Sequence, residues 1–220
     1  MRESRPWTFG LGLSNAGSAS SGKDRFTLSG GHTNVLNLDH QFVGAYTTSL
    51  ERFEDVRQLG LSYRVPLYAQ GGVIGASYTR VDVVGNYSAF TSTGAGRTLG
   101  LNHTLYLSPE GGRRSYVTVG VEYKVLDPSK INNTVVPGQF DRRSRPARLG
   151  YTVRTESDLA VWDFNADLAA NLGGGANNDL ASYQSEDPRI TTIRWKALRG
   201  GISYSSAVAR TWLLGLRGHF

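Results

Sequence analysis

The chain of 220 residues contains no cysteine, a single methionine and only 39% apolar residues. The absence of cysteine excludes a disulfide framework, a thiolate nucleophile, an iron–sulfur cluster and a zinc site with thiolate ligands. No segment approaches the roughly 20 consecutive apolar residues that a transmembrane helix needs. A sequence this poor in Leu, Ile and Met is not expected to bury a large dry core, although its aromatic and β-branched residues argue against disorder.

Positive charge is in excess, with a formal net charge of +6, but it is dispersed. The densest arginine group is interrupted by Asp, Ser and Pro and comprises Arg142, Arg143, Arg145 and Arg148. Binding of nucleic acid requires a continuous basic face, so nucleic acid is not an expected partner. The first residues contain no apolar segment of the signal-peptide type. Either export is irrelevant to this chain, or the sequence begins downstream of the start of its parent protein.

Apolar residues alternate with polar or very small residues along almost the whole chain, as at residues 59–67 and 117–125. A period of two is typical of β-strands. The pattern predicts about eleven strands, at roughly residues 7–15, 24–35, 40–50, 56–66, 72–84, 94–107, 114–126, 146–155, 159–172, 190–205 and 209–219. No segment has a convincing helical period, although residues 126–146 and 173–189 are ambiguous.

Strand length and the character of the two faces favour a membrane barrel. A tilted strand needs about 9–11 residues to cross a bilayer, and many of the predicted strands are at least this long. Strands of globular proteins average about 5–6 residues. One face carries the large apolar side chains, and the other carries Gly, Ser, Thr and Asn with occasional charges. We therefore predict an all-β fold, an antiparallel transmembrane β-barrel with lipid outside and water or a polar plug inside.

The predicted connections alternate in length, which is typical of barrels with short periplasmic turns and long outer loops. The short connections lie near residues 37–40, 69–72, 109–113, 155–158 and 206–209, and the others at 16–24, 51–55, 85–93, 127–145 and 173–189. Aromatic residues near the predicted strand ends indicate interfacial girdles, although aromatics are common in any strand. They are Trp7, Tyr63, Tyr123, Trp162, Trp195, Tyr204 and Trp212.

About eleven strands would leave the two termini on opposite rims, whereas bacterial single-chain barrels close with an even number. Two interpretations stay open. In the first, the strand count is wrong by one, and the barrel is complete with ten or twelve strands and ends on the aromatic residue Phe220. In the second, the protein continues beyond Phe220.

Several segments of the chain resemble one family of outer-membrane transporters. Residues 34–42 (NVLNLDHQF), 46–50 (YTTSL) and 61–67 (LSYRVPL) are similar to the opening barrel strands of two-partner secretion (TpsB-type) transporters, the haemolysin-activator and filamentous-haemagglutinin transporters. The resemblance implies a bacterial outer-membrane pore of about sixteen strands, within the known range of such barrels. It also implies surrounding outer-membrane lipid and a secreted partner exoprotein that crosses unfolded to the cell surface.

Members of that family carry periplasmic POTRA domains before the barrel and a luminal loop with a V-R-G-[FY] motif after the eleventh strand. Neither is found in residues 1–220. The chain is therefore expected to be a single outer-membrane β-barrel domain, a fragment without the POTRA domains and the last strands. The alternative is a self-contained small barrel that acts as a porin, an adhesin or a surface enzyme through its loops at residues 127–145 and 173–189.

No enzyme signature is found, and no cofactor or metal is predicted. The four histidines lie far apart in the sequence, and a site built from Asp163, Asp167 and His219 is a minor possibility. The candidate site is the set of charges in the polar register, which would line the lumen: Arg64, Glu122, Lys124, Arg148, Arg154, Asp163, Asp167, Arg199 and Arg217. Two interpretations remain open for these side chains. They pair across strands, which reduces the cost of desolvation, or they line a wet passage that favours an extended polypeptide and anions.

Overall fold

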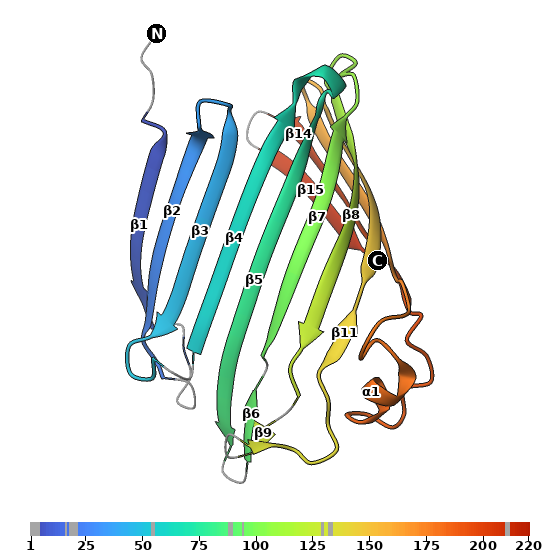
Figure 1. Ribbon diagram of the computed structural model, residues 1–220. Helices are drawn as coiled ribbons and strands as arrows, with labels where there is room; N and C mark the ends of the chain where they lie inside the picture. The colour runs from blue at the N-terminus through green and yellow to red at the C-terminus, as the bar shows by residue number, and fades with distance from the viewer. Residues whose placement is uncertain are drawn as a thin grey trace.

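The computed structural model describes the chain from residue 5 to 220 apart from residues 16, 18–21, 54–55, 88–89, 94, 129, 132–133 and 210–211. Eleven long strands form one antiparallel sheet in which each pairs with its neighbours in the chain (Figure 1). In spatial order they are β1 (Trp7–Ser14), β2 (Arg25–Val35), β3 (His40–Ser49), β4 (Val56–Leu67), β5 (Gly72–Tyr87), β7 (Gly96–Tyr106), β8 (Arg113–Leu126), β12 (Pro146–Glu156), β13 (Ala160–Asn171), β14 (Lys196–Ala209) and β15 (Trp212–His219).

Six short elements lie in the connections. A 3-10 turn, η1 (Tyr68–Gln70), joins β4 to β5, and the five-residue helix α1 (Leu180–Gln184) lies between β13 and β14. The short strands are β6 (Phe90–Thr93), which pairs with β5, β11 (Arg142–Ser144), which pairs with β8, and the hairpin of β9 (Lys130–Ile131) and β10 (Thr134–Val135). In the described part of the chain, no helix has the length and apolar character needed to cross a membrane.

The eleven predicted strands are all present, with two corrections at the end of the chain. The strand predicted at 190–205 begins only at Lys196, because the backbone carbonyls of Ile193 and Trp195 accept hydrogen bonds from Asn171 (2.8 and 3.0 Å). A short connection is predicted near 206–209, but β14 extends to Ala209 and β15 begins at Trp212, so this connection lies further along the chain. A bulge between Ala207 and Ala209 lets β14 continue its pairing with β15 up to Trp212.

Three of the predicted loops contain more regular structure than the sequence indicated, and the one at 127–145 holds β9, β10 and β11. β5 continues to Tyr87, inside the connection predicted at 85–93, and there forms a hairpin with β6. The segment 173–189, which was ambiguous, contains α1, whose first turn is capped by the Asp179 side chain accepting from the Ser182 amide at 2.8 Å. An Asp at this position satisfies one of the unpaired amides that begin a helix.

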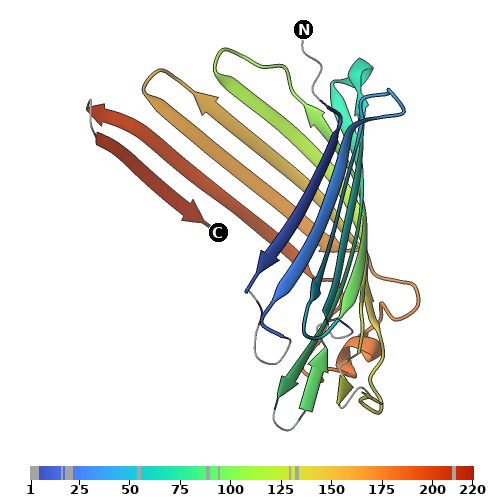
Figure 2. The ribbon, with the colours of Figure 1, turned by 90° about the vertical axis from the view of Figure 1, so that its left-hand side faces the viewer.

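The sheet is a single curved layer. Figure 2 shows β1–β7 almost edge-on, while β12–β15 sweep away from them, so that the sheet encloses a trough. The two outermost strands, β1 and β15, lie at opposite ends of the strand order. This is the arrangement of a barrel wall seen over part of its circumference.

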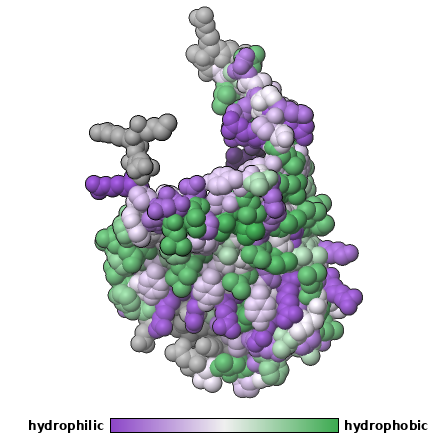
Figure 3. All heavy atoms as spheres, turned by 45° about the horizontal axis from the view of Figure 1, so that its top comes forward, coloured by the Kyte–Doolittle hydropathy of each residue, from purple (hydrophilic) through white to green (hydrophobic). Residues whose placement is uncertain are grey.

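The large apolar side chains are not packed between layers. Among the described apolar residues, Val56 and Val125 alone are buried, whereas Phe9 is 81% exposed and Leu216 is 62% exposed. Apolar side chains gather in broad patches over the outward face in Figure 3. An apolar surface of this extent is unstable in water and requires another apolar phase against it.

The long and short connections lie at opposite ends of the strands (Figure 1). The β2–β3 turn and η1 lie at one end, which we call the short-turn rim, and β6, β9 and α1 lie at the other, the long-loop rim. Trp7 and Trp212 open their strands at the short-turn rim. Trp162, close to the start of β13, contacts Tyr204 with ring centroids 4.4 Å apart. Aromatic side chains at strand ends are typical of the membrane interface.

Candidate functional site: the charged inner wall

The strand register places all nine predicted luminal residues on one face. Residues directly opposite one another in an antiparallel pair share a face. Arg64 on β4 connects in this way through Gly75, Asn102 and Gly120 to Arg148 on β12. Arg154 is opposite Asp163, Asp163 is opposite Ser203, and Ser203 is opposite Arg217, while Asp167 is opposite Arg199. Glu122 and Lys124 follow Gly120 at alternate positions of β8, so they belong to the same face.

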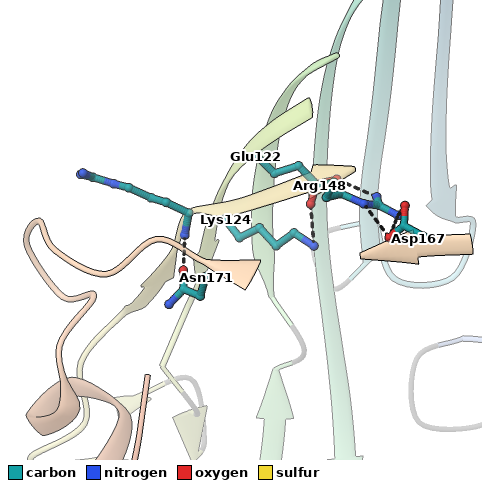
Figure 4. A network of polar contacts seen from close by, with 6 residues as sticks. Glu122, Lys124, Arg148, Asp167 and Asn171 are labelled. Atoms are coloured by element: carbon teal, nitrogen blue, oxygen red, sulfur yellow. Dashed lines mark hydrogen bonds and ion pairs between the residues drawn. The ribbon is translucent and has the colours of Figure 1, made fainter. Parts of the chain in front are cut away.

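Four of the nine residues form a continuous ion-pair network across β8, β12 and β13 (Figure 4). Arg148 is its centre, with one guanidinium nitrogen 3.1 Å from Glu122 Oε1 and another 3.2 Å from Asp167 Oδ2. Lys124 Nζ lies 2.8 Å from Glu122 Oε2. The Arg148 side chain is 43% exposed, so solvent screens these pairs and each contributes modestly to stability.

A second, looser group lies closer to the short-turn rim. Arg154 Nε donates to Glu156 at 2.6 Å, and another of its nitrogens lies 3.8 Å from Asp163 Oδ2. Within the described residues, Arg64, Arg199 and Arg217 form no ion pair. Both interpretations of the luminal charges therefore find support on this face, because some side chains pair across strands while three cations remain available.

A polar hollow of about 440 Å³ lies over the network on the inner face. Its lining includes Glu122, Arg148 and Asp167, together with the amides and hydroxyls of Ser77, Asn102, Thr118, Thr152 and Asn165. Sequence reasoning did not single out these neutral residues, although they occupy the same alternating register. Glycines beside this hollow leave no room for a larger side chain. A Cβ at Gly100 would lie 2.7 Å from Ser77 Oγ, and a Cβ at Gly75 would lie 2.6 Å from Asn102 Oδ1.

The loop between β13 and β14 is fastened to the long-loop rim by two buried asparagines. Asn171 Nδ2 donates to Asn178 Oδ1 at 3.0 Å, and Asn171 Oδ1 accepts from the Arg145 amide at 2.7 Å. Asn178 is 1% exposed and donates to the carbonyls of Leu172 and Gly174 (3.0 and 3.1 Å). These hydrogen bonds satisfy the side-chain polar atoms of both buried asparagines and so order a glycine-rich loop. No sequence signal beyond the asparagines themselves indicated this cluster.

The four arginines of the group at 142–148 form contacts with nearby side chains. Arg143 Nε donates to Asp141 at 2.8 Å, and Arg142 lies 3.6 Å from Glu186. Arg145 lies over the ring of Tyr123, 5.7 Å from its centroid, and Arg148 belongs to the luminal network.

Two groups of the same rim have shifted proton affinities. The Arg189 guanidinium binds Asp187 at 2.9 and 3.0 Å and holds the pKa of that carboxyl below its ordinary value. Burial raises the pKa of Tyr183, whose hydroxyl donates to the Arg143 carbonyl at 2.9 Å.

The minor catalytic alternative receives little support. Asp163 and His219 line one inner hollow of about 290 Å³ with Arg217, but no hydrogen bond joins the two side chains among the described residues. Asp167 is engaged by Arg148 instead. No group of three or more His, Cys, Asp or Glu in the described ranges is arranged to hold a metal ion. His103 lies opposite Ile74 and Val119 in the outer register.

Comparison with known proteins decides the family. The family described as Haemolysin secretion/activation protein ShlB/FhaC/HecB matches residues 1–217. The chain belongs to this family. No curated relative matches it.

Solved structures with the same fold include CdiB from Escherichia coli (TM-score 0.79, 15% identity, covering 100% of this chain and 41% of that one) and CdiB from Acinetobacter baumannii (0.69, 16%, 98% and 39%). BamA from Haemophilus ducreyi lacking POTRA domains 1–3 is also similar (0.56, 15%, 99% and 41%). The chain thus spans about two fifths of the length of the structures that it matches.

These matches confirm the predicted fold class and location. The ShlB/FhaC/HecB-type chain is an antiparallel transmembrane β-barrel protein of the bacterial outer membrane, and its family is one of secretion transporters. The apolar face of the sheet is therefore the lipid-facing outer wall, and the face with the charge network is the inner wall.

Proposed function

We propose that this chain forms part of the wall of a two-partner secretion pore, which moves an unfolded partner exoprotein across the outer membrane to the cell surface. The observation that carries the proposal is the single-layered sheet with an apolar outer face and a charged, polar inner face. Family membership supports a secretion role. The whole of residues 1–220 acts as one barrel domain in this proposal, and the parent protein supplies POTRA domains and the strands that complete about sixteen.

Strand direction supports the need for additional strands. All neighbours in the eleven-strand path are antiparallel, so β1 and β15 run in the same direction. Direct closure of these edges would make a parallel pair, and an unpaired edge in lipid leaves backbone amides without partners. An odd number of further antiparallel strands removes both problems.

The inner wall suits an extended polypeptide because its cations are held weakly. The nine luminal residues comprise six basic and three acidic side chains, and Arg64, Arg199 and Arg217 are outside the ion-pair networks. In water such guanidinium groups form exchangeable hydrogen bonds with backbone carbonyls and carboxylates, which permit sliding rather than tight binding. No cofactor is needed for this step.

The proposal is tested by deleting the parent gene in its native host and measuring the exoprotein at the cell surface. Loss of surface exoprotein, restored by the wild-type gene, supports the proposal, while unchanged export overturns it. Replacing Arg64, Arg199 and Arg217 with Gln is expected to slow export several-fold without reducing the folded protein in the membrane. Arg113→Gln is the matched control, because Arg113 is an exposed arginine at the first position of β8 and donates to the Tyr151 hydroxyl at 3.1 Å.

A further inference from the structure

The turn between β2 and β3 carries exposed apolar side chains on a strained backbone. Leu36 has a φ of 57° and is 79% exposed, and Leu38 is 55% exposed. The left-handed region is unfavourable for leucine, whereas Asn37 and Asp39, which also have positive φ, are of residue types that adopt it readily. Neither burial nor backbone geometry therefore favours a leucine at position 36. A residue that strains the fold in this way indicates a role in contacts outside the fold.

A polar hollow of about 550 Å³ lies beside this turn, on the inner face at the short-turn rim. Asp39 lines it and accepts a hydrogen bond from the Tyr68 hydroxyl of η1 at 2.8 Å, so the two turns are joined at the edge of the hollow. Its lining includes Thr33, Asp39, Gln41, Arg64, Tyr68 and Tyr106. We call Leu36, Leu38 and the lining of this hollow the mouth site.

The mouth site presents a guanidinium group that is free to bind a carboxylate. Arg64 forms neither a hydrogen bond nor an ion pair within the described residues. Tyr106 continues the lining onto β7 and contacts the ring of Tyr116 on β8, with centroids 6.0 Å apart. Arg114 follows on the inner face of β8, opposite Arg154, and it too has no ion pair in the described part of the chain. Tyrosine and arginine are the residue types enriched where proteins bind polypeptides.

The mouth site continues into the inner wall. Arg64 is directly opposite Gly75, and Gly75 is opposite Asn102, which lines the hollow over the Arg148 network. Adjacent strands lie about 4.8 Å apart, so this path across two strand spacings is about 10 Å long. An occupant that follows it needs about three residues of extended chain, at about 3.3 Å each. The geometry therefore favours an extended polypeptide over a compact solute.

We propose that the mouth site captures an extended segment of the unfolded exoprotein in which apolar residues flank an acidic one. Leu36 and Leu38 cover apolar side chains of the segment, and Arg64 pairs with its carboxylate. Folded proteins bury most such apolar side chains, so the site selects unfolded chains. The inference rests on the proposed function, because it identifies where the polypeptide enters the pore from the periplasmic side, on which the short turns lie.

The test uses the full-length protein in phosphatidylcholine nanodiscs and, as the probe, a short fluorescent peptide of Leu, Ser and Glu, whose binding is followed by anisotropy. L36N/L38N is expected to weaken binding about tenfold or more, because burial of even one leucine side chain contributes a factor of this size. Its unfolding temperature should equal or exceed that of the wild type, since Asn adopts positive φ more readily than Leu. R64Q should weaken binding of this peptide several-fold, but not binding of a peptide with Gln in place of Glu.

The matched controls are L159N and R113Q. Leu159 is a 67% exposed leucine in the β12–β13 turn of the same rim, and Arg113 lies on the outer face, opposite Thr155. Both variants should bind the peptide as the wild type does. Equal binding by L36N/L38N and the wild type overturns the proposal, and so does an R64Q variant that loses binding of the Glu and Gln peptides equally.

An experiment in the native host separates the mouth site from the pore itself. A photo-reactive residue at position 36 should crosslink to the exoprotein during export, and L36N/L38N should slow export. Crosslinks only to another part of the same chain, or to a second copy, overturn the mouth site. Normal export by L36N/L38N, together with loss of export on deletion of the parent gene, overturns the mouth site alone and leaves the proposed pore intact.

Discussion

An arginine placed at each of two adjacent residues of β7 tests which face of the sheet meets hydrocarbon. Leu101 lies in the outer row, is 54% exposed and has Val121 opposite it, whereas the next residue, Asn102, lines the inner hollow. Both positions are close to the middle of the strand. Leu101→Arg is expected to destabilise the protein in a bilayer by about 2–4 kcal/mol, the cost of an arginine on the lipid face near the membrane midplane. Asn102→Arg is expected to change stability by less than about 1 kcal/mol, because the inner wall is hydrated.

The measurement is equilibrium urea unfolding of the full-length protein in lipid vesicles, followed by tryptophan fluorescence and by the mobility difference between heated and unheated protein. The contrast between adjacent residues is decisive, because an exposed leucine of a water-soluble protein would tolerate arginine within about 0.5 kcal/mol. Equal costs at the two positions, or a larger cost at Asn102, would refute the assignment of the faces.

Further predictions concern the ion pairs of the inner wall and the loop between β13 and β14. Arg148→Gln is expected to lower the free energy of unfolding by about 1–2 kcal/mol. A double-mutant cycle with Asp167→Asn should give a coupling energy of about 0.5–1 kcal/mol between the two side chains, and a coupling energy of zero would show that the ion pair at 3.2 Å does not stabilise the protein. Asn178→Ala removes an amide that is 1% exposed, so limited proteolysis should cut the β13–β14 loop faster, and an unchanged rate would contradict the tethering. The contribution of the Asp187–Arg189 pair is complete above the ordinary pKa of an Asp and is lost as the pH falls through the depressed pKa of Asp187. Acid should therefore lower the amide protection factors of this loop, which are exchange rates normalised to the intrinsic rate at each pH, in the wild type but not in Asp187→Asn.

The alternation of residue types determined most of the architecture. Strand positions, the lipid-facing row that includes Leu99 and Leu101, and the polar row that includes Arg64 and Glu122 all follow from a period of two, because successive side chains of a strand point to opposite faces. The resemblance at residues 34–67 identified the family, which the match over residues 1–217 confirmed. These features are local, so they can be predicted from one segment at a time.

The tertiary structure decided which side chains meet. Arg148 reaches both Glu122 and Asp167, whereas Arg64 on the same row forms an ion pair with none of the acids that the structure describes. This difference depends on the register between strands, which no single strand encodes. The late start of β14 depends on Asn171, whose side-chain amide donates to the carbonyl of Ile193, 22 residues further along the chain. Alternation assigns a residue to a face, but hydrogen bonds and ion pairs need atoms within about 3–4 Å, and that proximity exists only once the strands have aligned.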